Sequence, residues 1–315
     1  MKYVLFAFFV LFAFGCGGDG SGGGVPVDVT TSIGTDTPVV LSLEADEWYT
    51  PFHLNLGDTL EFTLVGGRVV TIQLQESGYT YLEDEVILLW ADLLLDGEPL
   101  TITYSTLASF EFQVNEVFND GVIRIGLDGV RDLGYFTPTT FDDNSITLPP
   151  ADVRLWVNDA TIPIAPITHR WTDNVREFFT CRWLGYWSYG FHFGLDISLP
   201  VGSPLYVVAD GATFLGNIAT GPAPYNTLVR PSSNCYYVER PNGDKWYFRN
   251  GHTKATMAEP GDALESGQLY SLSGQEDGAE GMPHSHTFHY LVRADGAEFP
   301  VNPLHIIMLG NSLPR

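Results

Sequence analysis

The chain has 315 residues, more than one hydrophobic core usually organises, so its length predicts two domains with short appendages. Apolar residues make up 44% and charged residues 17%, as in folded proteins, while 33 glycines and 20 prolines favour strands joined by turns over long helices. The 38 acidic residues exceed the 15 basic ones and give a net charge of -23, which repels phosphate backbones and argues against a nucleic-acid partner.

Residues 1–16 have the pattern of a signal peptide. Lys2 precedes an apolar run over residues 3–14, which is too short to span a bilayer as a mature helix. The glycine before Cys16 resembles a bacterial lipoprotein cleavage site, and residues 17–26 have the composition of a flexible tether. We therefore expect an exported protein of the bacterial cell envelope, periplasmic or surface-facing, that meets the membrane only through a lipid on Cys16.

Residues 27–166 alternate between apolar and polar side chains, as strands with one buried face do. The clearest case is a hairpin in which residues 60–64 and 70–74 both alternate around a turn at Gly66-Gly67. Shorter alternating runs follow at residues 100–104, 110–114, 122–127 and 153–157. The pattern predicts a β-sandwich-like accessory domain. Its role stays open between spacing, partner binding and packing against the second domain, and we expect its one histidine, His53, to be structural.

The three cysteines fit an exported protein. If lipid modifies Cys16, then Cys181 and Cys235 remain as an even pair in an oxidising compartment, and we expect a disulfide between them. The alternative is two buried free thiols, because a sequence cannot place two Cα atoms within bonding distance. Neither cysteine has a C-x-x-C spacing, which argues against a zinc role for them.

His192 and Asp196 are metal-ligand side chains on either side of Gly194. Two ligands of one Zn²⁺ must each bring a donor atom within about 2.0 to 2.2 Å of the ion. Four steps of straight strand would separate them by roughly 13 Å, so the segment must bend, and Gly194 lies where the backbone can turn. The pair is interpreted as half of a zinc site, and the alternative is a loop histidine and a loop aspartate that never meet a metal.

Further motifs follow in a fixed order. They are His192-Phe-Gly-Leu-Asp196, Pro-x-Gly-x-Pro-x-Tyr at residues 200–206, Ala-Asp-Gly at 209–211, Glu-Pro-Gly-Asp at 259–262, Leu-Ser-Gly at 272–274 and Val-Asn-Pro at 301–303. Over roughly residues 191–303 this set resembles the lysostaphin and LytM family of zinc metalloendopeptidases. The resemblance implies a LytM-like antiparallel β-sheet peptidase domain at residues 167–315, and hence an all-β chain.

The resemblance also implies a metal-ligand set. In that family Zn²⁺ is held by the His and Asp of the first motif, here His192 and Asp196, and by the second histidine of an H-x-H on a late strand. Matching residues 289–293 to the family's His-Phe-Glu-Val-Arg makes His289 the third ligand, at about the family's distance from Asn302. The family's first histidine of the pair is then replaced by Thr287.

A rival alignment keeps the H-x-H motif intact. It takes His284-Ser-His286 as the pair and lengthens the spacing to Asn302. In the favoured alignment His286 is expected to be catalytic, although strict alternation turns it to the face opposite His289, so it would need a bulge or an irregular strand start. His252 resembles the family's histidine that lies beside the metal without binding it. The alternative for His252 is an exposed loop position.

Three protein ligands leave an open fourth position for water, as in catalytic zinc sites. The resemblance therefore implies an exported zinc-dependent endopeptidase that cleaves peptide bonds of peptidoglycan stems or cross-bridges. The alternative is a catalytically degenerate module that binds the cell wall or regulates another wall hydrolase, and Thr287 at the expected histidine position motivates it. A third reading is a structural lipoprotein whose histidines are incidental.

Overall fold

The computed structural model describes residues 25–35, 37–46, 48–82, 85–105, 117–118, 121–131, 151–162, 179–181, 186–187, 190–191, 195–217, 233–275, 283–296 and 298–301. Every regular element among these residues is a β-strand, which confirms the all-β prediction. The described part holds no helix with the length and apolar character that a membrane crossing needs. The predicted signal peptide, the tether and Cys16 lie outside the described residues.

One N-terminal sheet runs in the order β2-β4-β5-β6-β7, with β1 paired to β5. Its strands are β1 (Val27–Thr30), β2 (Val40–Glu44), β4 (Thr59–Thr63), β5 (Val69–Leu82), β6 (Glu85–Leu95) and β7 (Glu98–Ser105). The predicted hairpin is confirmed, because Leu60 pairs with Ile72 and Phe62 with Val70. These four side chains are fully buried, whereas Glu61 between them is exposed, as period-two alternation requires.

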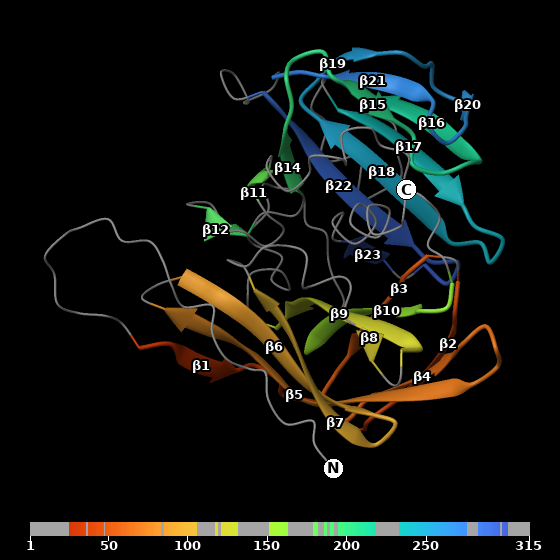
Figure 1. Ribbon diagram of the computed structural model, residues 1–315. Helices are drawn as coiled ribbons and strands as arrows, with labels where there is room; N and C mark the ends of the chain where they lie inside the picture. Colours follow the sequence, from red (N-terminus) through yellow and green to blue (C-terminus); the bar gives the residue numbers. More distant parts are fainter. Residues whose placement is uncertain are drawn as a thin grey trace, which may run out of the picture.

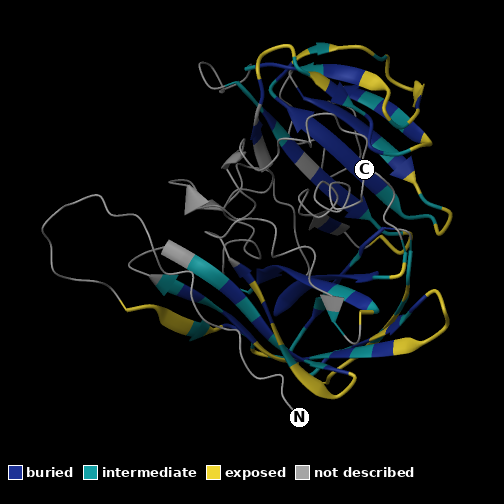
Figure 2. Cartoon of the chain, viewed as in Figure 1, coloured by how far each residue is buried: buried dark blue, intermediate teal, exposed yellow. Residues whose placement is uncertain are grey.

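A second N-terminal sheet runs in the order β3-β10-β9-β8. Its strands are β3 (Thr50–Leu54), β8 (Val117–Phe118), β9 (Ile123–Val130) and β10 (Val153–Asp159). The two sheets share a core, and every residue of β10 is buried. A strand buried along its whole length has both faces covered. Figures 1 and 2 show the reason: β9 and β10 lie between the β2-β4-β5-β6-β7 sheet and the C-terminal sheets.

The largest C-terminal sheet has the order β11-β14-β22-β18-β17-β16-β20. Its strands are β11 (Phe179–Cys181), β14 (Leu195–Ser198), β16 (Ala212–Asn217), β17 (Asn234–Glu239), β18 (Lys245–Gly251), β20 (Ala263–Leu264), β22 (His284–Val292) and β23 (Glu298–Val301). The long strand β22 has β18 along one side. Its other side is shared, because β14 pairs with residues 284–287 and β23 with residues 289–292.

Two smaller sheets complete the described fold. β15 (Pro204–Tyr206), β21 (Leu269–Ser273) and β19 (Thr253–Thr256) pair in that order, and β12 (Tyr186–Trp187) pairs with β13 (Gly190–Phe191). The buried polar side chains of β21 meet those of β17 and β18, so this small sheet packs on one face of the large one. The opposite face of the large sheet carries the histidines described below.

Aromatic side chains join the N-terminal strands to the large C-terminal sheet. Trp246 of β18 makes edge contacts with Trp48 and Tyr49, at ring-centroid distances of 5.2 and 5.1 Å. Arg240 forms an ion pair of 2.7 Å with Asp46 and lies over the Trp48 ring at 4.6 Å. Trp48, Tyr49 and Trp246 are all less than 9% exposed and belong to the core that both halves share. The two halves are therefore held together by buried surface.

The expected disulfide is not formed. Cys235 is a free, fully buried thiol on β17, whereas Cys181 lies on β11. The sheet order places β14, β22 and β18 between these two strands. Four interstrand spacings of about 4.8 Å put the two backbones roughly 19 Å apart, and a disulfide needs Cα atoms within about 7 Å.

Cys235 is expected to be chemically inert in the folded protein. Burial raises the pKa of its thiol from 9.0 to about 12. At pH 8 the reactive thiolate is then about 1,000-fold scarcer than for an ordinary cysteine, besides being out of reach of reagents. Iodoacetamide followed by mass spectrometry should leave Cys235 unmodified in native protein and alkylate it in urea. Rapid labelling of Cys235 in native protein would contradict its buried position.

His53 is expected to make the fold acid-sensitive. Desolvation lowers the pKa of His53 well below its ordinary value of 6.5, and the positive charges of Arg154 and Arg293 lower it further. Its Nε2 atom is buried without a hydrogen-bond partner in the described structure, and its ring lies 4.5 Å from that of Phe299. Below pH 6.5 His53 binds a proton in the unfolded chain but stays neutral in the folded chain. The free energy of unfolding therefore decreases as the pH is lowered, by up to about 1.4 kcal/mol per pH unit.

Urea unfolding at pH 7.5 and pH 5.5 measures this loss. His53→Phe keeps a ring against Phe299 and removes the titrating group, so its free energy of unfolding should change less between the two pH values than that of the wild type. Comparison at the same two pH values cancels the contribution of the other titrating groups. Equal pH dependence of the two proteins would rule out His53 as the source.

Candidate active site

Three histidines meet at one end of β22. His284 and His286 are two residues apart on that strand, so both rings lie on the same face. The ring of His252 lies 4.5 Å from that of His284 and 6.3 Å from that of His286, measured between centroids. All three side chains are partly exposed, unlike the core around them. The cluster therefore offers imidazole nitrogens at the surface of the sheet.

His252 is placed by the chain's passage between two sheets. β18 ends at Gly251, which pairs with His286, and β19 begins at Thr253 in the small sheet. Between them His252 adopts a φ of 57°, in the left-handed region. Such a conformation costs on the order of 1–3 kcal/mol for a residue other than glycine and persists where the surroundings enforce it. The fold thus holds the His252 backbone in an unfavourable conformation that turns its ring toward β22.

Asp196 enters this site through strand pairing. Its backbone on β14 lies directly opposite His286 on β22, and Leu195 lies opposite Thr287. Directly opposed residues of antiparallel strands have Cα atoms about 4.5–5.5 Å apart. Of the other predicted ligands, His192 lies outside the described residues. The described residues alone contain no group of three potential metal ligands.

The strand pairing does not bring His289 to this cluster. His286 and His289 are three residues apart, so the alternation of β22 turns them to opposite faces. His289 is 3% exposed, its ring lies 4.8 Å from that of Phe248, and its backbone pairs with Phe248 and Val301. It faces the core of the large sheet. The arrangement therefore favours the rival alignment, with His284-Ser-His286 as the H-x-H pair and His286 opposite Asp196.

Thr287 has a structural role on the buried face. Asn250 donates hydrogen bonds from Nδ2 to Ser285 Oγ at 2.7 Å and to Thr287 Oγ1 at 2.9 Å. The Tyr270 hydroxyl donates to Asn250 Oδ1, and burial raises the pKa of Tyr270 well above its ordinary value, so the donor proton is retained. Ser285 and Thr287, which alternate with His284 and His286 along β22, are thus hydrogen-bonded on the buried face of the sheet. This network holds the histidine-bearing end of β22 against β18.

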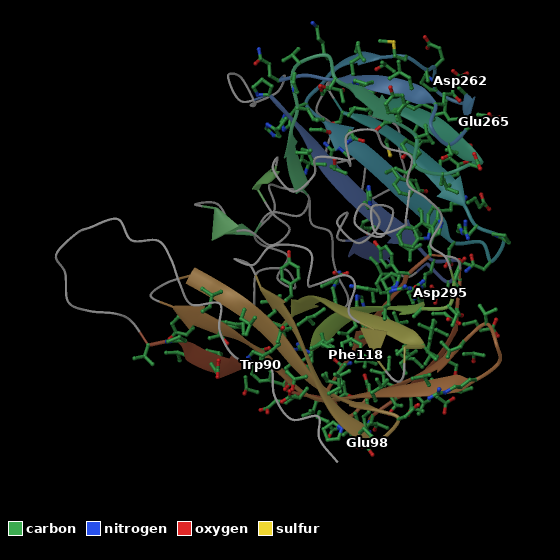
Figure 3. The ribbon with its side chains drawn as sticks, viewed as in Figure 1. Trp90, Glu98, Phe118, Asp262, Glu265 and Asp295 are labelled. Atoms are coloured by element: carbon green, nitrogen blue, oxygen red, sulfur yellow. The ribbon has the colours of Figure 1, made fainter. Side chains whose placement is uncertain are left out.

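The favoured alignment left His284 out of the predicted site, although its H-x-H spacing with His286 was a signal for including it. Asn250 was missed, and no local pattern marks it, because its partners lie 35 and 37 residues away. Three acidic side chains of the described residues lie away from this site. Figure 3 places Asp262 and Glu265 at the edge formed by β20, and Asp295 beside the N-terminal strands.

A scan of the chain against protein-family models finds no match, and neither does a search of curated proteins. Solved structures do resemble it. The catalytic domain of the antimicrobial peptidase lysostaphin from Staphylococcus simulans has 18% sequence identity, covers 45% of this chain and 98% of its own, and gives a TM-score of 0.31. A mutant catalytic domain of the prophage-encoded protein EnpA from Enterococcus faecalis has 21% identity, covers 44% of this chain and 94% of its own, and gives 0.27.

A zinc-containing peptidase from Vibrio cholerae has 14% identity, covers 75% of this chain and 56% of its own, and gives a TM-score of 0.27. Lysostaphin is a member of the family that the sequence motifs resemble. These likenesses are likenesses of fold, and for the two catalytic domains they extend over less than half of the present chain.

Proposed function

We propose that the chain is an exported zinc-dependent endopeptidase that cleaves peptide bonds in peptidoglycan stems or cross-bridges. The single observation that carries this proposal is the meeting of His252, His284 and His286 on one face of the sheet, with the Asp196 backbone opposite His286. The motifs around residues 191–303 supply the reaction class. Together they favour an active site over three incidental histidines.

The proposed zinc ligands are His192, Asp196 and His286. Two imidazoles and a carboxylate form a donor set typical of catalytic zinc, and three protein ligands leave a position open. The pairing of Asp196 with His286 supports this set, and the bend that the sequence predicts at Gly194 would let His192 reach the same ion. Zn²⁺ in such a site acts as a Lewis acid and lowers the pKa of water toward about 7.

His252 and His284 are the proposed acid–base pair. Their rings lie 4.5 Å apart and next to His286, so both can reach a substrate held at that ligand. One imidazole nitrogen accepts the proton of the attacking water, and the other ring donates a hydrogen bond to the oxygen that becomes negative in the transition state. His284 replaces His286 in this role, since His286 is needed as the third ligand.

The proposal also includes location and partners. A lipid on Cys16 and the glycine-rich residues 17–26 would keep the enzyme at the bacterial envelope, where peptidoglycan is available. A regulatory module acting on another wall hydrolase was motivated by Thr287 at a histidine position. The argument for a regulatory module is therefore weaker, because Thr287 is hydrogen-bonded to Asn250 on the buried face and His284-Ser-His286 retains both histidines of the motif.

Purified peptidoglycan tests the function. The wild-type protein should bind one zinc per chain and release soluble peptide-containing fragments, and a chelator should stop the release until zinc is restored. His252→Ala should lower turnover by about 10²- to 10⁴-fold with zinc still bound, because it removes a proton-transfer group and no ligand. A protein that leaves the polymer intact but changes the rate of an added amidase would be a regulator instead. Absence of zinc uptake would contradict the proposed zinc-dependent hydrolase.

A further inference from the structure

Asn234 fixes the polypeptide on the C-terminal side of His252. It is 3% exposed, and it begins β17 at the end of the large sheet that carries the histidines. Its Nδ2 donates to Thr253 Oγ1 at 3.0 Å and to Ser271 Oγ at 2.8 Å. Its Oδ1 accepts a hydrogen bond of 3.0 Å from Thr256 Oγ1. One side-chain amide therefore clamps both ends of β19 to β17 and β21.

The residue after His252 is thus anchored by its side chain as well as by its backbone. Thr253 is 5% exposed and pairs with Ser273 of β21. On the other side Gly251 pairs with His286, and a Cβ added at Gly251 would meet the His286 Cβ at 3.4 Å. His252 itself spans the step between the two sheets with its φ of 57°. Its conformation is therefore determined by how firmly residues 251 and 253 are held.

We infer that Asn234 is a positioning residue for His252, acting through Thr253, and this inference rests on the proposed function. The side-chain hydrogen bonds of Asn234 go to Thr253, Ser271 and Thr256. Loss of the clamp lets residue 253 shift, and His252 relaxes out of its left-handed conformation. The His252 ring then leaves the position 4.5 Å from His284, while Asp196 and His286 stay paired.

Asn234→Ala and Thr253→Val test the inference, because each removes one side of the same hydrogen bond, and Thr253→Val does so with little change of shape. A displacement of about 1 Å at a catalytic group costs on the order of 100-fold. Both variants should therefore lower kcat on peptidoglycan fragments by about 10- to 100-fold, with KM and zinc content near the wild-type values. Thr253→Ser keeps the hydroxyl oxygen and should restore most of kcat.

Asn158→Ala is the matched control. Asn158 is fully buried on β10, donates to the Trp48 carbonyl at 3.2 Å and accepts from Arg124 at 3.0 Å, so its loss also breaks a buried amide network. It should lower stability and leave kcat unchanged. If Asn158→Ala lowers kcat as much as Asn234→Ala, the effect is general destabilisation and the inference fails.

A second readout needs no activity. In the metal-free wild type, the His252 and His284 ring protons should give a nuclear Overhauser contact, since the rings are 4.5 Å apart. Asn234→Ala and Thr253→Val should lose it, while Thr253→Ser and Asn158→Ala keep it. An unchanged contact in both loss variants overturns the inference. A wild type that shows the contact but never cleaves peptidoglycan refutes the proposed function and leaves the positioning role standing.

Discussion

His286→Ala is expected to abolish zinc-dependent turnover, whereas His289→Leu should retain bound zinc and activity. Structural zinc sites with four ligands bind with about 10–16 kcal/mol, so loss of one protein ligand should weaken zinc affinity by about two to three orders of magnitude. His286 lies opposite Asp196, and His289 packs on Phe248 at the other face. Zinc titration of both variants, alongside peptidoglycan release, separates the two alignments.

The choice of leucine at position 289 serves as the control for folding. His289 is buried, and a smaller side chain would leave a cavity that lowers stability regardless of any metal. Leucine retains most of the volume against Phe248 and cannot bind zinc. Loss of zinc from the folded His289→Leu variant, with binding retained by His286→Ala, would restore His289 as the third ligand.

Trp246→Ala is expected to cost about 3–5 kcal/mol of stability and to uncouple the two halves of the chain. Trp246 is 2% exposed and touches Trp48 and Tyr49 across the junction. Because both halves contribute to one core, the wild type should unfold in urea in a single transition seen equally by circular dichroism and tryptophan fluorescence. In the variant the two signals should separate.

Phe62→Ala provides the comparison. Phe62 is fully buried on β4, where it pairs with Val70 of β5 in the N-terminal half, so its removal should cost a similar 3–5 kcal/mol. Its unfolding should remain a single transition, at lower urea concentration. Separate transitions already in the wild type, or in Phe62→Ala as well, would show that the junction does not couple the halves.

Local patterns in the sequence predicted local structure well. The hairpin of β4 and β5 was predictable because its apolar residues alternate on both sides of a short glycine turn, and period-two burial leaves one register. The site could be predicted only in part. The motifs singled out His192, Asp196, His252 and the histidines of β22, and the pattern does show that residues 286 and 289 face opposite ways.

The sequence could not show which histidines of β22 share a face of the sheet with Asp196 and His252. That choice depends on Asp196 pairing with His286, a contact between residues 90 positions apart. The disulfide prediction failed for the same reason, because the order of strands across a sheet is decided by long-range pairing and leaves no local mark at Cys181 or Cys235. The Asn234 and Asn250 networks likewise join residues that only the folded sheet brings together.

β18 and β22 carry the aromatic junction at one end and the histidines at the other. Lys245 pairs with Val292 near the junction, and Gly251 pairs with His286 at the opposite end. The 7 residues of β18 span about 20 Å. The length of β18 therefore fixes the distance between the aromatic junction and the histidines. Changing the length of the glycine-rich tether at residues 17–26 would therefore leave the distance between the aromatic junction and the histidines unaltered.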